Sequence, residues 1–251
     1  MKWEYNQSEY GGSMNIGNEL FIDIKHLCGN RWSVKREDLD TYSRQIRRAA
    51  RDVSKLRQSG KGLDGSQILF PHLPYLRKEE VLISREEREA LLRLREEAKG
   101  YDAVISIGIG GSYLGIRCFL ISSAAPTGTS SPKKSGRDTP QIYFSGQNVN
   151  PVSLTDLASC IKREAGRIAD RRMKVLFLVI SKSGTTIELV TAVRGLKKLL
   201  APVCDIHFMA ITDKEKGRIR PLAEKEHFPC FTVPDGIGGR FSVFSQGQVS
   251  P

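Results

Sequence analysis

The sequence lacks the features that mark membrane and secreted proteins. No stretch approaches the roughly 20 consecutive apolar residues that a membrane-spanning helix requires. The first six residues, MKWEYN, are polar and contain no apolar run of the kind found in secretory signals. We therefore expect a cytoplasmic protein with no membrane partner.

Cysteine pairs are also missing. The five cysteines, at positions 28, 118, 160, 204 and 230, are scattered, and no two of them form a CxxC pair. An odd and dispersed set argues against a disulfide framework and against a zinc site. Cys118 and Cys204 lie in apolar surroundings, where cysteine mostly acts as a small hydrophobic residue.

Positive charge is abundant, with 39 Lys and Arg against 28 Asp and Glu and a net charge of +11. Such a charge raises the possibility of nucleic-acid binding. The basic residues are nevertheless spread along the chain and alternate with acids, without a helix-turn-helix, a zinc finger or an aromatic RNA-binding platform. We expect a solvated basic surface that favours anionic metabolites, and no nucleic-acid partner.

The first 98 residues predict a helical region. Apolar residues recur at spacings of three and four over residues 33–58, which indicates an amphipathic helix. A second helix is expected at about 84–98, where Ser84 and Glu87 form a capping-box pattern and Gly100 provides a stop signal.

From residue 101 onward, short apolar runs alternate with helical patterns. The runs are DAVISI (102–107), QIYF (141–144), VLFLVI (175–180), IHFMAIT (206–212) and FTV (231–233). The helical patterns between them cover 112–122, about 153–171, 185–200 and 214–226, and a Ser/Pro-rich stretch at 125–140 predicts a surface loop. This alternation predicts an α/β domain over residues 99–251, with a doubly wound parallel sheet flanked by helices.

Three loops that follow predicted strands carry candidate chemistry, because ligands of open α/β sheets bind at the carboxyl ends of the strands. The first is the glycine loop, Gly108–Ser112. Its glycines allow close approach of an anion, and Ser112 is expected at the N-cap of the following helix. A dinucleotide site is the alternative, but no acidic residue ends a strand about 20 residues further on.

The second is the hydroxyl loop, Ser181–Thr186, which has the sequence SKSGTT and opens a predicted helix. Four hydroxyl groups and a glycine at a helix N-terminus are suited to binding a phosphate dianion. Lys182 adds a positive charge, and the spacing differs from that of a Walker A loop. Phosphate recognition is therefore favoured over phosphoryl transfer.

The third is the arginine loop, Asp235–Ser242, where paired glycines precede Arg240. An arginine at this place can stabilise an oxyanion that develops during proton transfer.

The three loops together resemble the glucose-6-phosphate isomerase family, through GIGGSYLG at 108–115, VISKSGTTIE at 179–188 and GIGGRFSV at 236–243. Their order and nearly even separation also agree with the family, and the compact SKSGTT form is similar to the shorter bacterial and archaeal type. The resemblance implies a pair of sugar-isomerase (SIS) domains, of which residues 99–251 would be the first.

The resemblance implies interconversion of glucose 6-phosphate and fructose 6-phosphate, a step of glycolysis and gluconeogenesis, through ring opening and a cis-enediol(ate). It implies a small sugar phosphate as the partner, no metal or organic cofactor, and homodimers among full-length members. By position, Arg240 would stabilise the enediolate. The residues that would hold the substrate are Gly111, Ser112, Ser181, Lys182, Ser183, Thr185 and Thr186.

The family also uses a glutamate base, with a histidine and a lysine for ring opening, and all three lie beyond the arginine loop. Because eleven residues follow Arg240 here, we expect the second domain to be missing and the chain to be inactive alone. Neither Glu188 nor His207 is expected to replace the base. Two alternatives remain open: a non-catalytic phosphosugar-binding SIS module, and an isomerase acting on mannose or amino-sugar phosphates.

Overall fold

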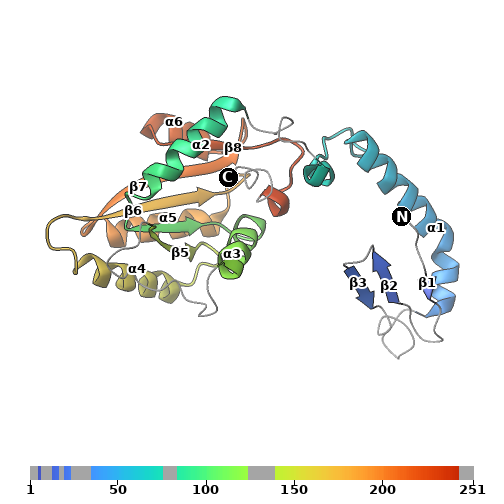
Figure 1. Ribbon diagram of the computed structural model, residues 1–251, viewed down its shortest axis with the longest axis horizontal. Helices are drawn as coiled ribbons and strands as arrows, with labels where there is room; N and C mark the ends of the chain where they lie inside the picture. The colour runs from blue at the N-terminus through green and yellow to red at the C-terminus, as the bar shows by residue number, and fades with distance from the viewer. Residues whose placement is uncertain are drawn as a thin grey trace. The chain divides into compact units, whose positions relative to one another are not determined.

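The computed structural model describes two compact units, Met1–Ser59 and Gly60–Pro251 (Figure 1). The described residues are 5–6, 13–16, 20–23, 35–75, 84–123 and 139–242. The surface loop predicted at 125–140 lies almost entirely outside these residues. None of the described helices is both long and apolar enough to cross a membrane.

The first unit combines a small antiparallel sheet with one long helix. The sheet has the order β1-β2-β3 and was not predicted from the sequence, which indicated only helices in this region. Its strands are β1 (Tyr5–Asn6), β2 (Ser13–Ile16) and β3 (Leu20–Asp23). The helix α1 (Arg36–Ser59) has Glu37 and Asp38 in its first turn and Arg57 in its last, which complements the helix dipole.

The second unit contains a five-stranded parallel sheet with the order β5-β4-β6-β7-β8. The strands are β4 (Ala103–Ile107), β5 (Gln141–Ser145), β6 (Met173–Ile180), β7 (Cys204–Asp213) and β8 (Cys230–Val233). Helices α3 (Gly111–Ser123), α4 (Pro151–Ala165), α5 (Ile187–Leu200) and α6 (Ile219–Glu226) connect successive strands. The predicted doubly wound α/β fold is confirmed.

Two apolar clusters cover the two faces of this sheet. On one face, Phe177 and Ile105 pack with buried residues of α4 and α5, such as Ile161 and Leu196. On the other face, the strands pack against α3, against α2 (Arg85–Ala98) and against the 3₁₀ turn η2 (Phe70–Tyr75). Figure 1 shows α2 and α4 on opposite sides of the sheet. Helices therefore cover both faces, as a fully parallel sheet requires.

Helix α2 is fixed to the sheet by its first turn. The Ser84 hydroxyl accepts a hydrogen bond from the Glu87 backbone N–H at 3.1 Å, which is the predicted N-cap contact. The Glu87 carboxylate accepts a hydrogen bond from the backbone N–H of Thr232 in β8. A residue predicted to act within its own helix thus joins that helix to an edge strand.

The amino end of the sheet is held by an ion pair. The Arg171 guanidinium donates two hydrogen bonds to the Asp102 carboxylate, at 2.6 and 2.8 Å. The Lys174 backbone N–H donates to the same carboxylate at 2.8 Å. Bidentate arginine–carboxylate pairs are among the stronger polar contacts in proteins, so this pair fixes the start of β4 beside the start of β6. The three loops lie at the opposite, carboxyl end of the sheet.

Candidate functional site

The order of the strands places the glycine loop and the hydroxyl loop side by side. The chain proceeds from β4 to β5 on one side and then crosses to β6 on the other, so the direction of winding reverses between β4 and β6. Open α/β sheets bind ligands at such a switch point. The glycine loop reaches the end of β6 there, because a β-carbon added to Gly108 would lie 3.3 Å from the carbonyl oxygen of Ile180, the residue before the hydroxyl loop.

The glycine loop turns directly into α3. Gly110 has a φ of 57°, a conformation that favours glycine. The backbone N–H groups of Tyr113 and Leu114 both donate to the Gly110 carbonyl, at 3.0 and 2.8 Å. Because α3 begins at Gly111, Ser112 lies within its first turn and not before the helix as predicted. The Ser112 N–H donates to the Ile109 carbonyl at 3.2 Å, so the glycine loop itself bonds the first N–H groups of this helix.

The hydroxyl loop brings its side chains into one cluster. The Thr186 hydroxyl lies 3.5 Å from the hydroxyls of both Ser181 and Ser183. The Thr185 hydroxyl lies 3.4 Å from that of Ser183. Ser181 is buried and accepts a hydrogen bond from the Gly184 N–H at 3.1 Å. Thr186 precedes α5 without capping it through its side chain, so this hydroxyl cluster lies beside the helix N-terminus.

The segment after β7 packs against the backbone of the hydroxyl loop. A β-carbon on Gly217, whose φ is 92°, would lie 2.3 Å from the Ser183 carbonyl oxygen. A β-carbon on Gly184 would lie 3.1 Å from the Arg218 backbone nitrogen. The Asp213 N–H donates to the Lys182 carbonyl at 3.3 Å. These backbone contacts fix the shape of the hydroxyl loop before any ligand binds.

Asp213 organises this supporting segment. Its carboxylate accepts hydrogen bonds from the backbone N–H groups of Glu215 and Lys216, at 3.0 and 2.8 Å. Burial alone raises the pKa of Asp213, but these two bonds and the positive charges of Lys182 and Lys216 outweigh it, and the pKa lies below its ordinary value. The carboxylate is therefore ionised when the loop is in place.

We expect Asp213→Asn to destabilise the chain in a pH-dependent manner. Because folding lowers the pKa of Asp213, its stabilising effect is present above the ordinary pKa of 3.8 and is lost as the pH falls through the folded-state value. Urea unfolding should show a lower midpoint for the variant at pH 7 and a smaller difference near pH 3. A difference that stays constant between these pH values would contradict this assignment.

The arginine loop lies against the glycine loop. A β-carbon on Gly111 would lie 2.0 Å from the Arg240 Cα, 2.4 Å from its backbone nitrogen and 2.5 Å from the Gly239 carbonyl oxygen. Residue 111 therefore has room only for glycine. Arg240 belongs to the short 3₁₀ turn η3 (Gly239–Phe241), and its side chain is exposed. The contact places the backbone of Arg240 against the start of α3.

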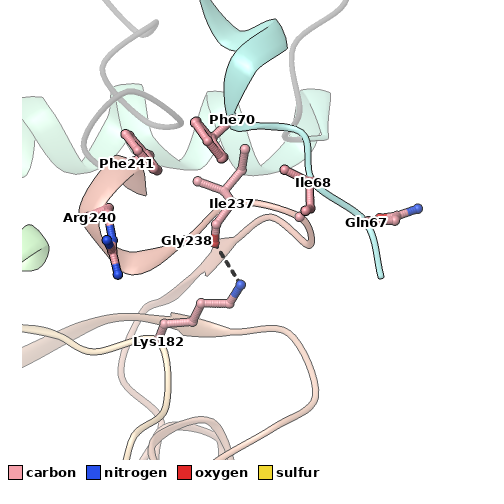
Figure 2. Close-up of a pocket in the computed structure, with 9 residues that line it drawn as sticks. Gln67, Ile68, Phe70, Lys182, Ile237, Gly238, Arg240 and Phe241 are labelled. Atoms are coloured by element: carbon pink, nitrogen blue, oxygen red, sulfur yellow. Dashed lines mark hydrogen bonds between the residues drawn. The ribbon is translucent and has the colours of Figure 1, made fainter. Parts of the chain in front are cut away.

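Lys182 and Arg240 line one open pocket of about 480 Å³, together with Ile237 and Phe241 (Figure 2). The Lys182 ammonium donates a hydrogen bond to the Ile237 carbonyl at 2.7 Å. Figure 2 shows both cationic side chains below the arginine loop, on the side away from the aromatic rings. The pocket therefore offers two positive charges beside an apolar wall.

Residues 67–70 form that wall, and the sequence did not predict them to be part of the site. Gln67, Ile68 and Phe70 also line the pocket. The Phe70 ring stacks on the Phe241 ring, with centroids 4.0 Å apart and an interplanar angle of 3°. The Leu69 N–H donates to the Gly236 carbonyl at 2.8 Å. In the sequence, this segment carries no signal beyond the turn glycines that precede it.

Relatives with known names match this chain in part. The sequence is 38% identical to the glucose-6-phosphate isomerase of Acetivibrio thermocellus over 174 residues, which are 66% of this chain and 37% of that protein. It is 33% identical to the glucose-6-phosphate isomerase of Lactococcus lactis subsp. cremoris over 230 residues, which are 87% of this chain and 46% of that protein. The chain belongs to the glucose-6-phosphate isomerase family.

The match to this family is partial in length. The chain spans less than half of the length of these two isomerases. The crystal structure of a hypothetical protein from Thermus thermophilus is similar at a TM-score of 0.52 and 27% identity, covering 85% of this chain and 44% of that one. No protein-family model matches the sequence.

The structure brings some of the residues predicted from the family resemblance together and leaves others apart. Gly111 contacts the backbone of Arg240, and Arg240 shares the pocket with Lys182. The clustered hydroxyls lie on the same loop as Lys182, but none of them lines this pocket. The residues that lie outside its lining are Gly111, Ser112, Ser181, Ser183, Thr185 and Thr186.

Neither Glu188 nor His207 is placed for catalysis, as expected from the sequence. Glu188 is half-buried in the first turn of α5 and does not line the pocket. His207 lies in β7, where its ring nitrogen is 3.1 Å from the Asp205 carboxylate and its ring meets Tyr101 edge-on. Among the described residues, no three or more His, Cys, Asp or Glu side chains gather in a way that could hold a metal ion.

Proposed function

We propose that this chain binds a hexose 6-phosphate at the switch point between β4 and β6. The contact between Gly111 and the Arg240 backbone carries this proposal, because it joins two family motifs that are far apart in sequence. In this account, the phosphate lies at the hydroxyl cluster and the N-terminus of α5. The residues that would hold the substrate are Gly111, Ser112, Ser181, Ser183, Thr185 and Thr186, with Lys182 on the same loop as the last four.

We further propose that the site serves the interconversion of glucose 6-phosphate and fructose 6-phosphate. This reaction moves a proton between C2 and C1 and develops negative charge on the enediolate oxygens. The Arg240 guanidinium would stabilise that charge in a pocket that already holds the Lys182 ammonium. Residues 99–251 would act as the SIS domain, with α2 covering one face of its sheet. The cytoplasmic location and the homodimeric state of full-length members are proposals of the same kind.

A second candidate function is phosphosugar binding without turnover. None of the nine residues that line the pocket is an acid or a histidine. A general base must come within hydrogen-bond distance of the proton that it removes, and these lining residues supply no carboxylate or imidazole for this, while Lys182 is bonded to the Ile237 carbonyl. This observation favours a binding site that depends on groups from elsewhere for catalysis.

We expect the 251-residue chain to bind fructose 6-phosphate and to convert it no faster than background. Calorimetric titration should show binding of fructose 6-phosphate but not of fructose, because the hydroxyl loop recognises the phosphate. A coupled assay for glucose 6-phosphate measures turnover. Equal binding of both sugars would contradict the phosphate site, and robust isomerisation would show that a base is present after all.

A further inference from the structure

The side chain of Lys182 is directed toward the arginine loop and bonded to it. Its ammonium donates a hydrogen bond to the Ile237 carbonyl at 2.7 Å (Figure 2). The family resemblance assigns Lys182 to the phosphate. We propose that Lys182 is instead a positioning residue, which ties the hydroxyl loop to the arginine loop and thereby sets the place of the Arg240 guanidinium. This inference rests on the proposed function, since it concerns the same site.

Both ends of this bond are firmly held. The Lys182 carbonyl accepts a hydrogen bond from the Asp213 N–H, so the backbone of the lysine is fixed to the end of β7. Ile237 is fully buried, and its N–H donates to the Pro234 carbonyl at 3.3 Å. A hydrogen bond from an ammonium group is stronger than one between neutral groups. Displacement of either loop would therefore stretch a strong bond.

Arg240 is close enough along the chain to respond to this bond. The Phe241 N–H donates to the Gly238 carbonyl at 2.9 Å, which closes a turn around Arg240 directly after Ile237. The Gly111 contact and the Phe70–Phe241 stack hold the same turn through backbone and ring atoms. Lys182 differs from these in coming from the hydroxyl loop. It can therefore align the site for the phosphate with the site for the oxyanion.

A matched pair of ligands separates this role from direct contact with the phosphate. 6-Phosphogluconate and glucitol 6-phosphate share the phosphate and the carbon chain, and they differ at C1, where the first has a carboxylate and the second an alcohol. The carboxylate carries charge near the place where the enediolate oxygens would form. Arg240 should therefore favour 6-phosphogluconate, whereas a phosphate contact favours neither ligand.

We expect Lys182→Met to weaken binding of 6-phosphogluconate about tenfold and binding of glucitol 6-phosphate less than about twofold, as measured by calorimetry. In an Arg240→Met background, Lys182→Met should cause no further loss for 6-phosphogluconate. Lys182 acts only through the position of Arg240, so replacing Arg240 already removes its effect. Lys198→Met, which removes the same charge from the exposed far end of α5, is the control and should alter neither affinity.

Other outcomes overturn the proposal in distinguishable ways. Equal losses for the two ligands would show that Lys182 contacts the phosphate. If the unaltered chain bound both ligands with equal affinity, Arg240 would not interact with the group at C1. If the unaltered chain binds neither ligand, the proposed function itself fails.

A second measurement uses the unaltered chain, so it does not depend on whether a variant folds. The Gly238 amide nitrogen is bonded to the Ile237 carbonyl carbon, so its NMR resonance reports on the Lys182–Ile237 bond. With saturating glucitol 6-phosphate, this resonance should stay in place while those of Ser183 and Thr186 move. A comparable shift at Gly238 would show that the ammonium leaves the carbonyl for the phosphate, and would overturn the proposal.

Discussion

Gly111→Ala should lower the free energy of unfolding by about 2 kcal/mol and weaken fructose 6-phosphate binding at least about tenfold. The added β-carbon would lie 2.0 Å from the Arg240 Cα, and the three nearest atoms are all backbone atoms of the arginine loop, so no flexible side chain can move away. The arginine loop must therefore shift as a whole, which displaces Arg240 from the pocket. Urea unfolding measures the first effect and calorimetry measures the second.

Gly239→Ala is the matched control for this substitution. Gly239 adjoins Arg240 in the same loop, but a β-carbon there meets no atom within 4 Å. We expect this variant to keep the stability and affinity of the unaltered chain. If Gly111→Ala behaves in the same way as Gly239→Ala, the close contact between the two loops does not exist.

Gly217→Ala should have the largest effect on stability, a loss of about 3 kcal/mol. Two costs combine at this position: a left-handed φ of 92°, which costs an L-residue about 1 kcal/mol, and a β-carbon 2.3 Å from the Ser183 carbonyl oxygen. The collision pushes on the middle of the hydroxyl loop. Affinity for inorganic phosphate, measured by calorimetry, should fall together with the unfolding midpoint.

Gly65→Ala separates these two costs. Gly65 also has a positive φ, 78°, but a β-carbon there meets nothing within 4 Å. This variant should lose about 1 kcal/mol of stability through backbone strain and keep its affinity for phosphate. Equal destabilisation by the two substitutions would mean that the segment after β7 does not support the hydroxyl loop.

The sequence predicted the sheet well because buried parallel strands have a strong signature. Runs such as VLFLVI correspond to strands buried on both faces, and the glycine and hydroxyl loops follow two of them as expected. The order of the strands was not predicted. It places the end of β4 beside that of β6, which brings the two loops together.

Two predicted helices are shorter in the structure, and each difference has a local cause. Helix α4 was predicted to reach about residue 171 but ends at Ala165, and Arg171 instead binds Asp102. Helix α6 was predicted from 214 but begins at Ile219. The Asp213 carboxylate binds the N–H groups of the next turn, and Gly217 has a positive φ that interrupts a helix.

The candidate site was predicted as residue types but not as contacts. The loop motifs and the family resemblance pointed to Gly111, Lys182 and Arg240, yet they gave no indication that Gly111 touches Arg240 or that Lys182 binds a carbonyl. The wall formed by Gln67 and Phe70 was not predicted either. Such contacts depend on tertiary packing between segments that are far apart in the chain, and no local pattern encodes them.

The most direct test of the account maps where fructose 6-phosphate binds. In NMR spectra of the ¹⁵N-labelled chain, the ligand should shift the amide signals of the three loops at the carboxyl end of the sheet: 108–112, 181–187 and 239–241. Signals of Asp102 and Arg171, at the amino end, should stay in place. Shifts at the amino end, or none at the hydroxyl loop, would contradict a sugar-phosphate site between β4 and β6.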